Sequence, residues 1–106
     1  MKQINGENIK VGDYLKGISK KPELKEGECD TTYFEVIKID DIEASLEDGR
    51  RRERIWANSF FDFKNGKLLK IVKDEQFLYS DELNYYKITE EEYYKILGKI
   101  IITNSL

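Results

Sequence analysis

Apolar and polar residues alternate through much of this chain, and turn residues interrupt the alternation at short intervals. Residues 10–17, KVGDYLKG, predict a first strand that is interrupted by a Gly-Asp turn or bulge, with Val11 and Leu15 available to the core. The next segment, residues 18–31, is polar and contains the single proline, which predicts a long exposed loop. Residues 32–47 are rich in aromatic and β-branched residues and predict one long, bent strand or two short ones.

Two dipeptides predict tight hairpin turns, Asp48-Gly49 and Asn65-Gly66, because both accept the positive φ angles that two-residue turns require. A two-residue turn at Asp48-Gly49 would place Glu43 opposite Arg54 and Ile42 opposite Ile55. A further strand is predicted at 84–88.

The C-terminal segment changes from a strand pattern to a helical one at Thr89. Thr89 and Glu92 form a capping-box pattern, and apolar residues recur at helical spacing after it. Gly98 is a favourable residue for ending a helix, so we expect about two helical turns. The apolar run at 99–103, KIIIT, then predicts a last strand.

These elements predict a mainly β (α+β) fold, an antiparallel meander of about six or seven strands that forms a small barrel or sandwich with one short C-terminal helix. A chain of 106 residues with 40% hydrophobic residues can bury a core as a single domain over residues 1–106. It has no apolar run long enough to span a membrane and no signal-peptide pattern at its start, so we expect a cytoplasmic protein without a membrane partner.

The composition argues against most catalytic chemistry. The chain has no histidine, which removes the usual general base and the usual partner of a nucleophile, and Cys29 is the single cysteine. We therefore expect no enzyme, no cofactor, no metal site and an inert thiol at Cys29. An enzyme that uses only carboxylates or a metal ion is the least favoured alternative.

The segments NIKVGDYLKG at the start and FEVIKID after the long loop, with a short helix before the end, resemble a small SH3-like barrel. That resemblance implies a fold used for binding peptides, proteins or nucleic acid. In its size and its lysine, isoleucine, asparagine and tyrosine bias, the chain is also similar to short accessory proteins of phages and mobile elements, including inhibitors of bacterial defence systems of the anti-CRISPR type.

All four arginines of the chain lie in one stretch, EDGRRRERIW at 47–56. Six acidic residues accompany them between residues 40 and 56, so the segment as a whole does not favour a phosphate backbone. Arginine stacks on aromatic rings, and tryptophan and arginine often anchor protein interfaces. We therefore expect a protein-contact surface that includes Arg50, Arg52, Arg54 and Trp56.

The last third of the chain is acidic and rich in tyrosine, a combination that suits a basic partner. The candidate contact residues here are Tyr85, Tyr86, Glu90, Glu91, Glu92 and Tyr94. The function that the sequence favours is a non-catalytic protein-binding module, a small inhibitor or regulator that blocks the surface of a larger protein, such as a nucleic-acid-handling or defence protein. A nucleic-acid-binding SH3-like barrel is the alternative, although the net charge of −3 makes nucleic acid an unfavourable direct ligand.

Overall fold

The computed structural model describes residues 3–4, 9–43, 51–79 and 83–104. Within these ranges the chain forms nine β-strands and one α-helix. The elements are β1 (Gln3–Ile4), β2 (Tyr14–Ser19), β3 (Thr31–Glu35), β4 (Lys38–Glu43), β5 (Arg51–Ala57), β6 (Phe60–Lys64), β7 (Lys67–Val72), β8 (Gln76–Tyr79), β9 (Leu83–Ile88) and α1 (Glu90–Asn104).

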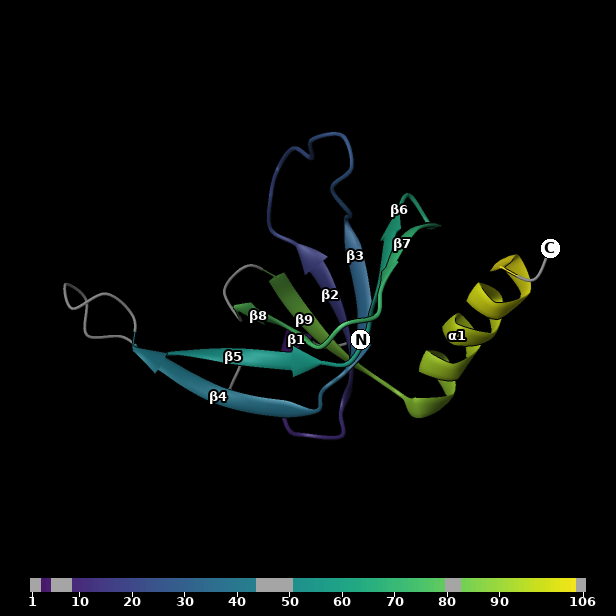
Figure 1. Cartoon of the computed structure of the whole chain (residues 1–106). Helices are drawn as coiled ribbons and strands as arrows, with labels where there is room; N and C mark the ends of the chain where they lie inside the picture. Colours follow the sequence, from purple (N-terminus) through teal and green to yellow (C-terminus); the bar gives the residue numbers. More distant parts are fainter. Residues whose placement is uncertain (1–2, 5–8, 44–50, 80–82, 105–106) are drawn as a thin grey trace.

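The strands form two antiparallel sheets (Figure 1). The larger sheet has the order β1-β9-β2-β3-β6-β7, and the smaller one has the order β4-β5-β8. Hairpin β4–β5 and helix α1 extend in opposite directions from the larger sheet (Figure 1). The expected mainly β fold with one C-terminal helix is therefore confirmed. In the part of the chain that the structure describes, no helix is long and apolar enough to cross a membrane.

The main core lies between the two sheets. Leu15 on β2 and Phe34 on β3 face it from the larger sheet, and both side chains are fully buried. Ile55 on β5 faces it from the smaller sheet, and Ile39 and Leu78 pack against it. Alternation along β2 and β3 places Leu15 and Phe34 on the face that lies against this core.

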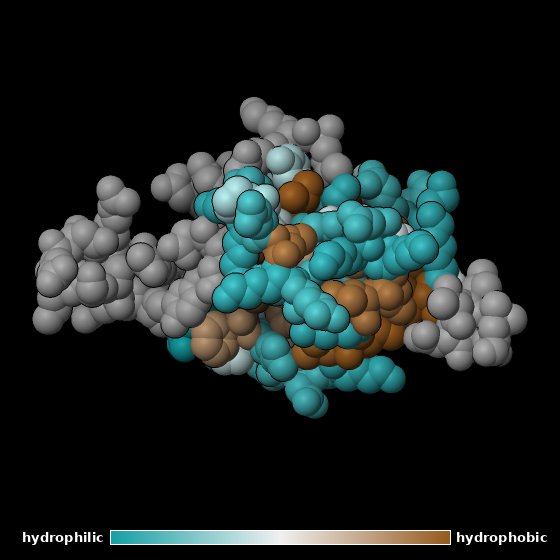
Figure 2. All heavy atoms as spheres, turned by 90° about the horizontal axis from the view of Figure 1, so that it is seen from above, coloured by the Kyte–Doolittle hydropathy of each residue, from teal (hydrophilic) through white to brown (hydrophobic). Residues whose placement is uncertain are grey.

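A second apolar cluster covers the opposite face of the larger sheet, where α1 packs. Tyr93 and Ile100 of α1 are buried there with Phe61 and Ile88 of the sheet. Seen from above, apolar side chains form a band on the α1 side of the molecule, bordered by polar ones (Figure 2). The larger sheet is therefore covered on both faces.

One detail of the first half differs from expectation, and one open alternative is decided. Val11 is 62% exposed, because it lies in a turn before β2 in which Gly12 adopts a φ of +95°. Of the two alternatives for the segment at 32–47, two short strands are the correct one as far as residue 43: β3 and β4 are separate and belong to different sheets. Val11 thus lies outside the core, whereas Leu15 is at its centre.

The register of hairpin β4–β5 is three residues away from the expected one. Arg54 lies opposite Asp40 instead of Glu43, and Ile55 lies opposite Ile39 instead of Ile42. The expected turn at Asp48-Gly49 falls outside the described residues. The observed register is consistent with core packing, because it places the partly buried Ile39 beside the buried Ile55, and a shift by an odd number of residues would exchange the two faces of a strand.

The second predicted hairpin is confirmed. Asn65 and Gly66 both adopt positive φ angles, 53° and 77°, and connect β6 to β7 with Lys64 opposite Lys67. Positive φ at both central positions is the geometry that an Asn-Gly turn favours.

Helix α1 starts as expected but continues beyond the expected end. The Thr89 hydroxyl accepts a hydrogen bond of 3.1 Å from the backbone N–H of Glu92, which caps the first turn. The helix then passes through Gly98 to Asn104, so the predicted strand at 99–103 is wrong. The apolar run there extends the buried helical stripe, since Ile100 lies seven residues after Tyr93 and both are buried.

Gly98 provides a test of this longer helix. A Cβ at position 98 would meet no atom within 4 Å, so Gly98→Ala is expected to raise the free energy of unfolding by about 0.5–1 kcal/mol, because alanine has the higher helix propensity. Urea unfolding of both chains measures the difference. A destabilised alanine variant would mean instead that Gly98 ends the helix in a left-handed conformation.

Candidate functional site

The outer face of the smaller sheet gathers polar and aromatic side chains from three strands. Alternation on β5 points Ile55 and Ala57 into the core and leaves Arg54 and Trp56 on the other face. Trp56 lies opposite Lys38 on β4 and opposite Phe77 on β8. We call the five side chains that share this surface the arginine-aromatic face: Lys38, Asp40, Arg54, Trp56 and Phe77.

A bidentate ion pair fixes the position of Arg54 on this face. Its Nε and Nη2 atoms donate hydrogen bonds of 2.9 Å to the two carboxylate oxygens of Asp40. The hydrogen bonds from Arg54 hold the pKa of the Asp40 carboxyl below its usual value, with smaller contributions from Trp56 and Lys38. A two-pronged pair of this kind sets the plane of the guanidinium group as well as its position.

The guanidinium group of Arg54 also contacts two aromatic rings. Its central carbon lies 5.5 Å from the ring centroid of Trp56 and 5.1 Å from that of Phe77. The two rings are themselves 4.9 Å apart at an angle of 51°, and the ammonium group of Lys38 lies 5.2 Å from the Trp56 ring. The expected cation–π contact between Arg54 and Trp56 is therefore present.

The arginine-aromatic face combines rigid contacts with exposed apolar surface. Phe77 is 38% exposed, which is high for a phenylalanine, while Trp56 is half-buried. The indole Nε1 of Trp56 is buried and makes no hydrogen bond of ordinary geometry, although its N–H is among the groups that lower the Asp40 pKa. A face of this kind can pack against apolar groups and still offer charges of both signs at its edge.

Of the two other arginines that were predicted for the contact surface, the structure describes the position of one. Arg50 falls outside the described residues. Arg52 lies on β5 opposite Ile42, whereas a two-residue turn at Asp48-Gly49 would have placed it opposite Ser45. Of the cluster, the structure therefore brings Arg54 and Trp56 together.

The predicted acidic, tyrosine-rich surface divides into buried and exposed residues. Tyr85 is 2% exposed and packs edge-to-face on Phe34, so it belongs to the core and cannot form a contact surface. Tyr86 is half-buried on β9, opposite Lys16 of β2. The exposed candidates all lie at the start of α1, and they are Glu90, Glu91, Glu92 and Tyr94.

Tyr94 belongs to a small ring cluster at the start of the helix. It is 52% exposed, and its ring lies 6.0 Å from that of Tyr14 and 5.7 Å from that of Tyr93. The hydrogen bond with Tyr94 raises the pKa of Tyr14, and burial raises the pKa of Tyr93 to about 12. The Tyr14 and Tyr93 phenols are therefore neutral at physiological pH, and the cluster offers aromatic surface beside carboxylates.

Within the described ranges, no three Asp, Glu or Cys side chains are grouped in a way that could hold a metal ion. Cys29 is half-buried at the end of the loop between β2 and β3. Burial raises the pKa of the Cys29 thiol to about 11, and the negative charge of Asp62 adds to the shift. A thiol with a raised pKa is a poor nucleophile at neutral pH.

The reactivity of Cys29 gives a direct test of this environment. The pKa change from 9.0 to about 11 leaves about 100-fold less thiolate at pH 7.5, so we expect alkylation by iodoacetamide to be slow and its rate to rise up to about pH 11. Asp62→Asn should move that midpoint toward lower pH, because it removes the neighbouring charge. A rate that levels off below pH 9 in the unaltered chain would contradict this description.

No protein-family model, curated protein or solved structure matches this chain significantly. The likeness to SH3-like barrels and to phage accessory proteins therefore stays a prediction.

Three residues of the arginine-aromatic face were missed from the sequence: Lys38, Asp40 and Phe77. Lys38 and Asp40 lie on a strand that was expected, but the assumed register paired Arg54 with a different carboxylate. Strand β8 was not expected at all, although the alternation in QFLY, at 76–79, is a short strand signal. The correct register of hairpin β4–β5 would have placed Asp40 beside Arg54.

Proposed function

We propose that this chain is a non-catalytic protein-binding module, and that the arginine-aromatic face is its contact surface. The observation that carries the proposal is Arg54, which is held by Asp40 and stacked against Trp56 and Phe77. Tryptophan and arginine are the residues that most often dominate the binding energy of protein interfaces.

The fixed geometry of the face supports this role. A side chain that is already held in place loses little conformational entropy when a partner binds. Arg54 has two hydrogen bonds and two ring contacts before any partner arrives, and Trp56 is packed between Lys38 and Phe77. The face therefore needs little rearrangement to form the centre of an interface.

The position of the face supports the proposal as well. It lies on the sheet that contains the projecting hairpin β4–β5, on the side of the molecule away from α1 (Figure 1). A projecting hairpin can reach a recess on a larger protein and obstruct it. We propose that the chain regulates or inhibits a larger protein, such as a nucleic-acid-handling or defence protein, by this kind of surface blocking.

A comparative capture experiment tests the proposal. Tagged chains would be incubated with lysate of the cells that contain the protein, and bound proteins would be quantified by mass spectrometry. Arg54→Glu should abolish the enrichment of the partner, because it breaks both the ion pair and the ring contacts. Arg54→Lys keeps the charge but loses the bidentate geometry, so an intermediate enrichment is expected.

A triple variant at the other end of the molecule serves as the matched control. Glu90→Lys, Glu91→Lys and Glu92→Lys together reverse the charge of exposed residues on α1 and should leave the enrichment unchanged. Loss of the partner with the triple variant and its retention with Arg54→Glu would move the contact surface to α1. Failure of the unaltered chain to enrich any protein would contradict the protein-binding function itself.

A further inference from the structure

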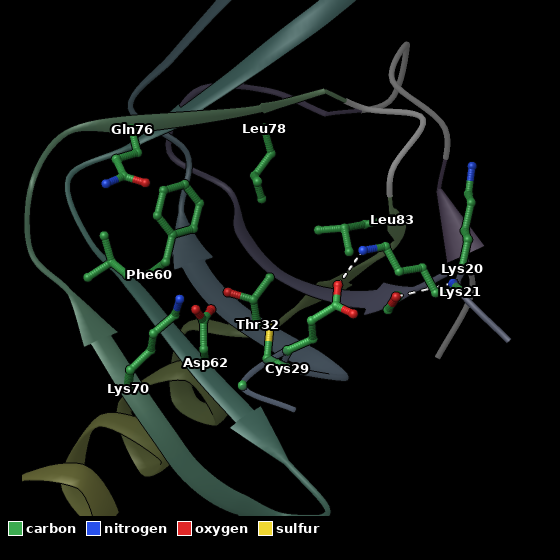
Figure 3. Close-up of a pocket in the computed structure, with 14 residues that line it drawn as sticks. Lys20, Lys21, Cys29, Thr32, Phe60, Asp62, Lys70, Gln76, Leu78 and Leu83 are labelled. Carbon is green, nitrogen blue, oxygen red and sulfur yellow. Dashed lines mark hydrogen bonds and ion pairs between the residues drawn. The ribbon is translucent and has the colours of Figure 1, made fainter. Parts of the chain in front are cut away.

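A cavity of about 660 Å³ lies between the two sheets and beneath the loop that connects β2 to β3 (Figure 3). Its volume is within the range of sites that hold small molecules. Part of its wall is apolar, and these side chains come from four strands: Phe60, Val72, Leu78 and Leu83. The cavity is separate from the arginine-aromatic face, since Leu78 and Phe77 are successive residues on β8 and point to opposite sides.

A row of cross-strand neighbours on the larger sheet places polar side chains in this cavity. Asp62 on β6 lies opposite Thr32 on β3 and opposite Lys70 on β7. Thr32 in turn lies opposite Gly17, which has no side chain. Leu83 occupies the space above Gly17, where a Cβ would come within 2.7 Å of the Leu83 Cδ1 atom. The row therefore presents a carboxylate and a hydroxyl next to an apolar wall.

Both polar groups are buried, and the Thr32 hydroxyl lacks a hydrogen-bond partner. The side chain of Asp62 is 8% exposed; it accepts a hydrogen bond from the Cys29 thiol but takes part in none of the ion pairs found among the described residues, so its charge has no counterion there. Thr32 is 3% exposed, and its Oγ1 atom has no hydrogen-bond partner. Burying a hydroxyl without a hydrogen bond and a carboxylate without a counterion is costly, whereas a bound cationic ligand that donates hydrogen bonds would offset that cost.

The remaining charges of the cavity are at its edge. Lys21 forms an ion pair with Glu28, and this contact lowers the pKa of the Glu28 carboxyl. Lys20 and Lys70 are exposed and remain hydrated. The buried end of the cavity is thus acidic and its rim is basic, so an anionic ligand would meet Asp62 unfavourably while a cationic head group would find its counterion there.

We propose that this cavity binds a small primary amine with an apolar body, with the ammonium group against Asp62 and Thr32. An ionised carboxylate only accepts hydrogen bonds, and an ammonium group only donates them, so the two are matched. The apolar body would lie against Phe60 and Leu83 and bury surface there. This site is independent of the protein-contact function, because it uses the opposite face of β8.

Nuclear magnetic resonance titration of the full chain tests the proposal with three probes of similar size: 2-phenylethylamine, 2-phenylethanol and 3-phenylpropanoate. The amine should give saturable shifts at Cys29, Thr32, Asp62 and Leu83, with millimolar affinity for so small a molecule. The alcohol should bind at least about tenfold more weakly than the amine, since it lacks the charge-assisted hydrogen bond. The carboxylate should not bind.

Two variants that should change the affinity for the amine in opposite directions distinguish a loss of binding from a loss of folding. Asp62→Asn should weaken binding of the amine by about tenfold or more. Lys70→Gln should strengthen it by about twofold, because it removes a cation from the rim of the site. A variant that had merely lost its fold could not bind more tightly, so Lys70→Gln and the probe series decide the question even if Asp62→Asn fails to fold.

The proposal would be overturned by equal binding of the amine and the alcohol, or by an amine affinity that does not respond to Asp62→Asn in a folded chain. Absence of saturable shifts with the amine up to about 10 mM would overturn it as well.

Discussion

Phe34→Ala is expected to lower the free energy of unfolding by about 3–5 kcal/mol, enough to remove most of the stability of a small domain. Phe34 is fully buried at the centre of the larger sheet. Its ring centroid lies 5.0 Å from that of Phe60 and 6.2 Å from that of Tyr85. Alanine would leave a void among side chains from three strands that are hydrogen-bonded in the sheet and cannot close around it.

Phe77→Ala is the matched control for that measurement, because it makes the same chemical change on the outer face of the smaller sheet. Phe77 is 38% exposed, so its truncation should cost less than about 1 kcal/mol. Urea unfolding of both variants gives the comparison. Equal losses of stability would mean that the core between the two sheets is not packed as described.

Trp56→Ala is expected to weaken binding of the captured partner by about 30-fold or more, which corresponds to about 2 kcal/mol. The change removes the ring that contacts Arg54, Lys38 and Phe77, so it takes away apolar area and also the support of the arginine. Calorimetry with the purified partner measures the affinity, and the thermal unfolding midpoint shows whether the variant is folded.

Tyr94→Ala is the control for the loss of affinity. Tyr94 is an exposed aromatic residue, as an interface anchor should be, but it lies on α1 at the other end of the molecule. Its truncation should change the affinity by less than about twofold. An effect as large as that of Trp56→Ala would mean that both ends contact the partner.

The strands and turns that local chemistry determines could be predicted from the sequence. Asn65 and Gly66 specify their hairpin because both tolerate positive φ, and Thr89 specifies the start of α1 because its hydroxyl accepts a hydrogen bond from the first turn. Leu15 was expected in the core from alternation alone, and it is fully buried.

The errors arose where contacts between distant segments decide the outcome. The register of β4–β5 places the partly buried Ile39 against the buried Ile55, and an Asp-Gly signal alone does not contain that information. The apolar run at 99–103 suits a strand or a helix, and packing of α1 against the larger sheet favours the helix.

The candidate site could be predicted only in part for the same reason. Arg54 and Trp56 are two residues apart on one strand, so alternation places them on one face. Phe77 reaches that face from β8, 21 residues after its cross-strand partner Trp56, and β8 also contributes to the wall of the cavity. Such pairings depend on the whole fold.

Photo-cross-linking tests most directly whether the arginine-aromatic face contacts a protein. A photoreactive benzoylphenylalanine would be placed at position 77, or at position 94 as the control, and the chain would be irradiated in its own cells. We predict a discrete protein adduct from position 77 and none from position 94. An adduct from position 94 alone, or from neither position, would contradict the assignment of this face as the binding surface.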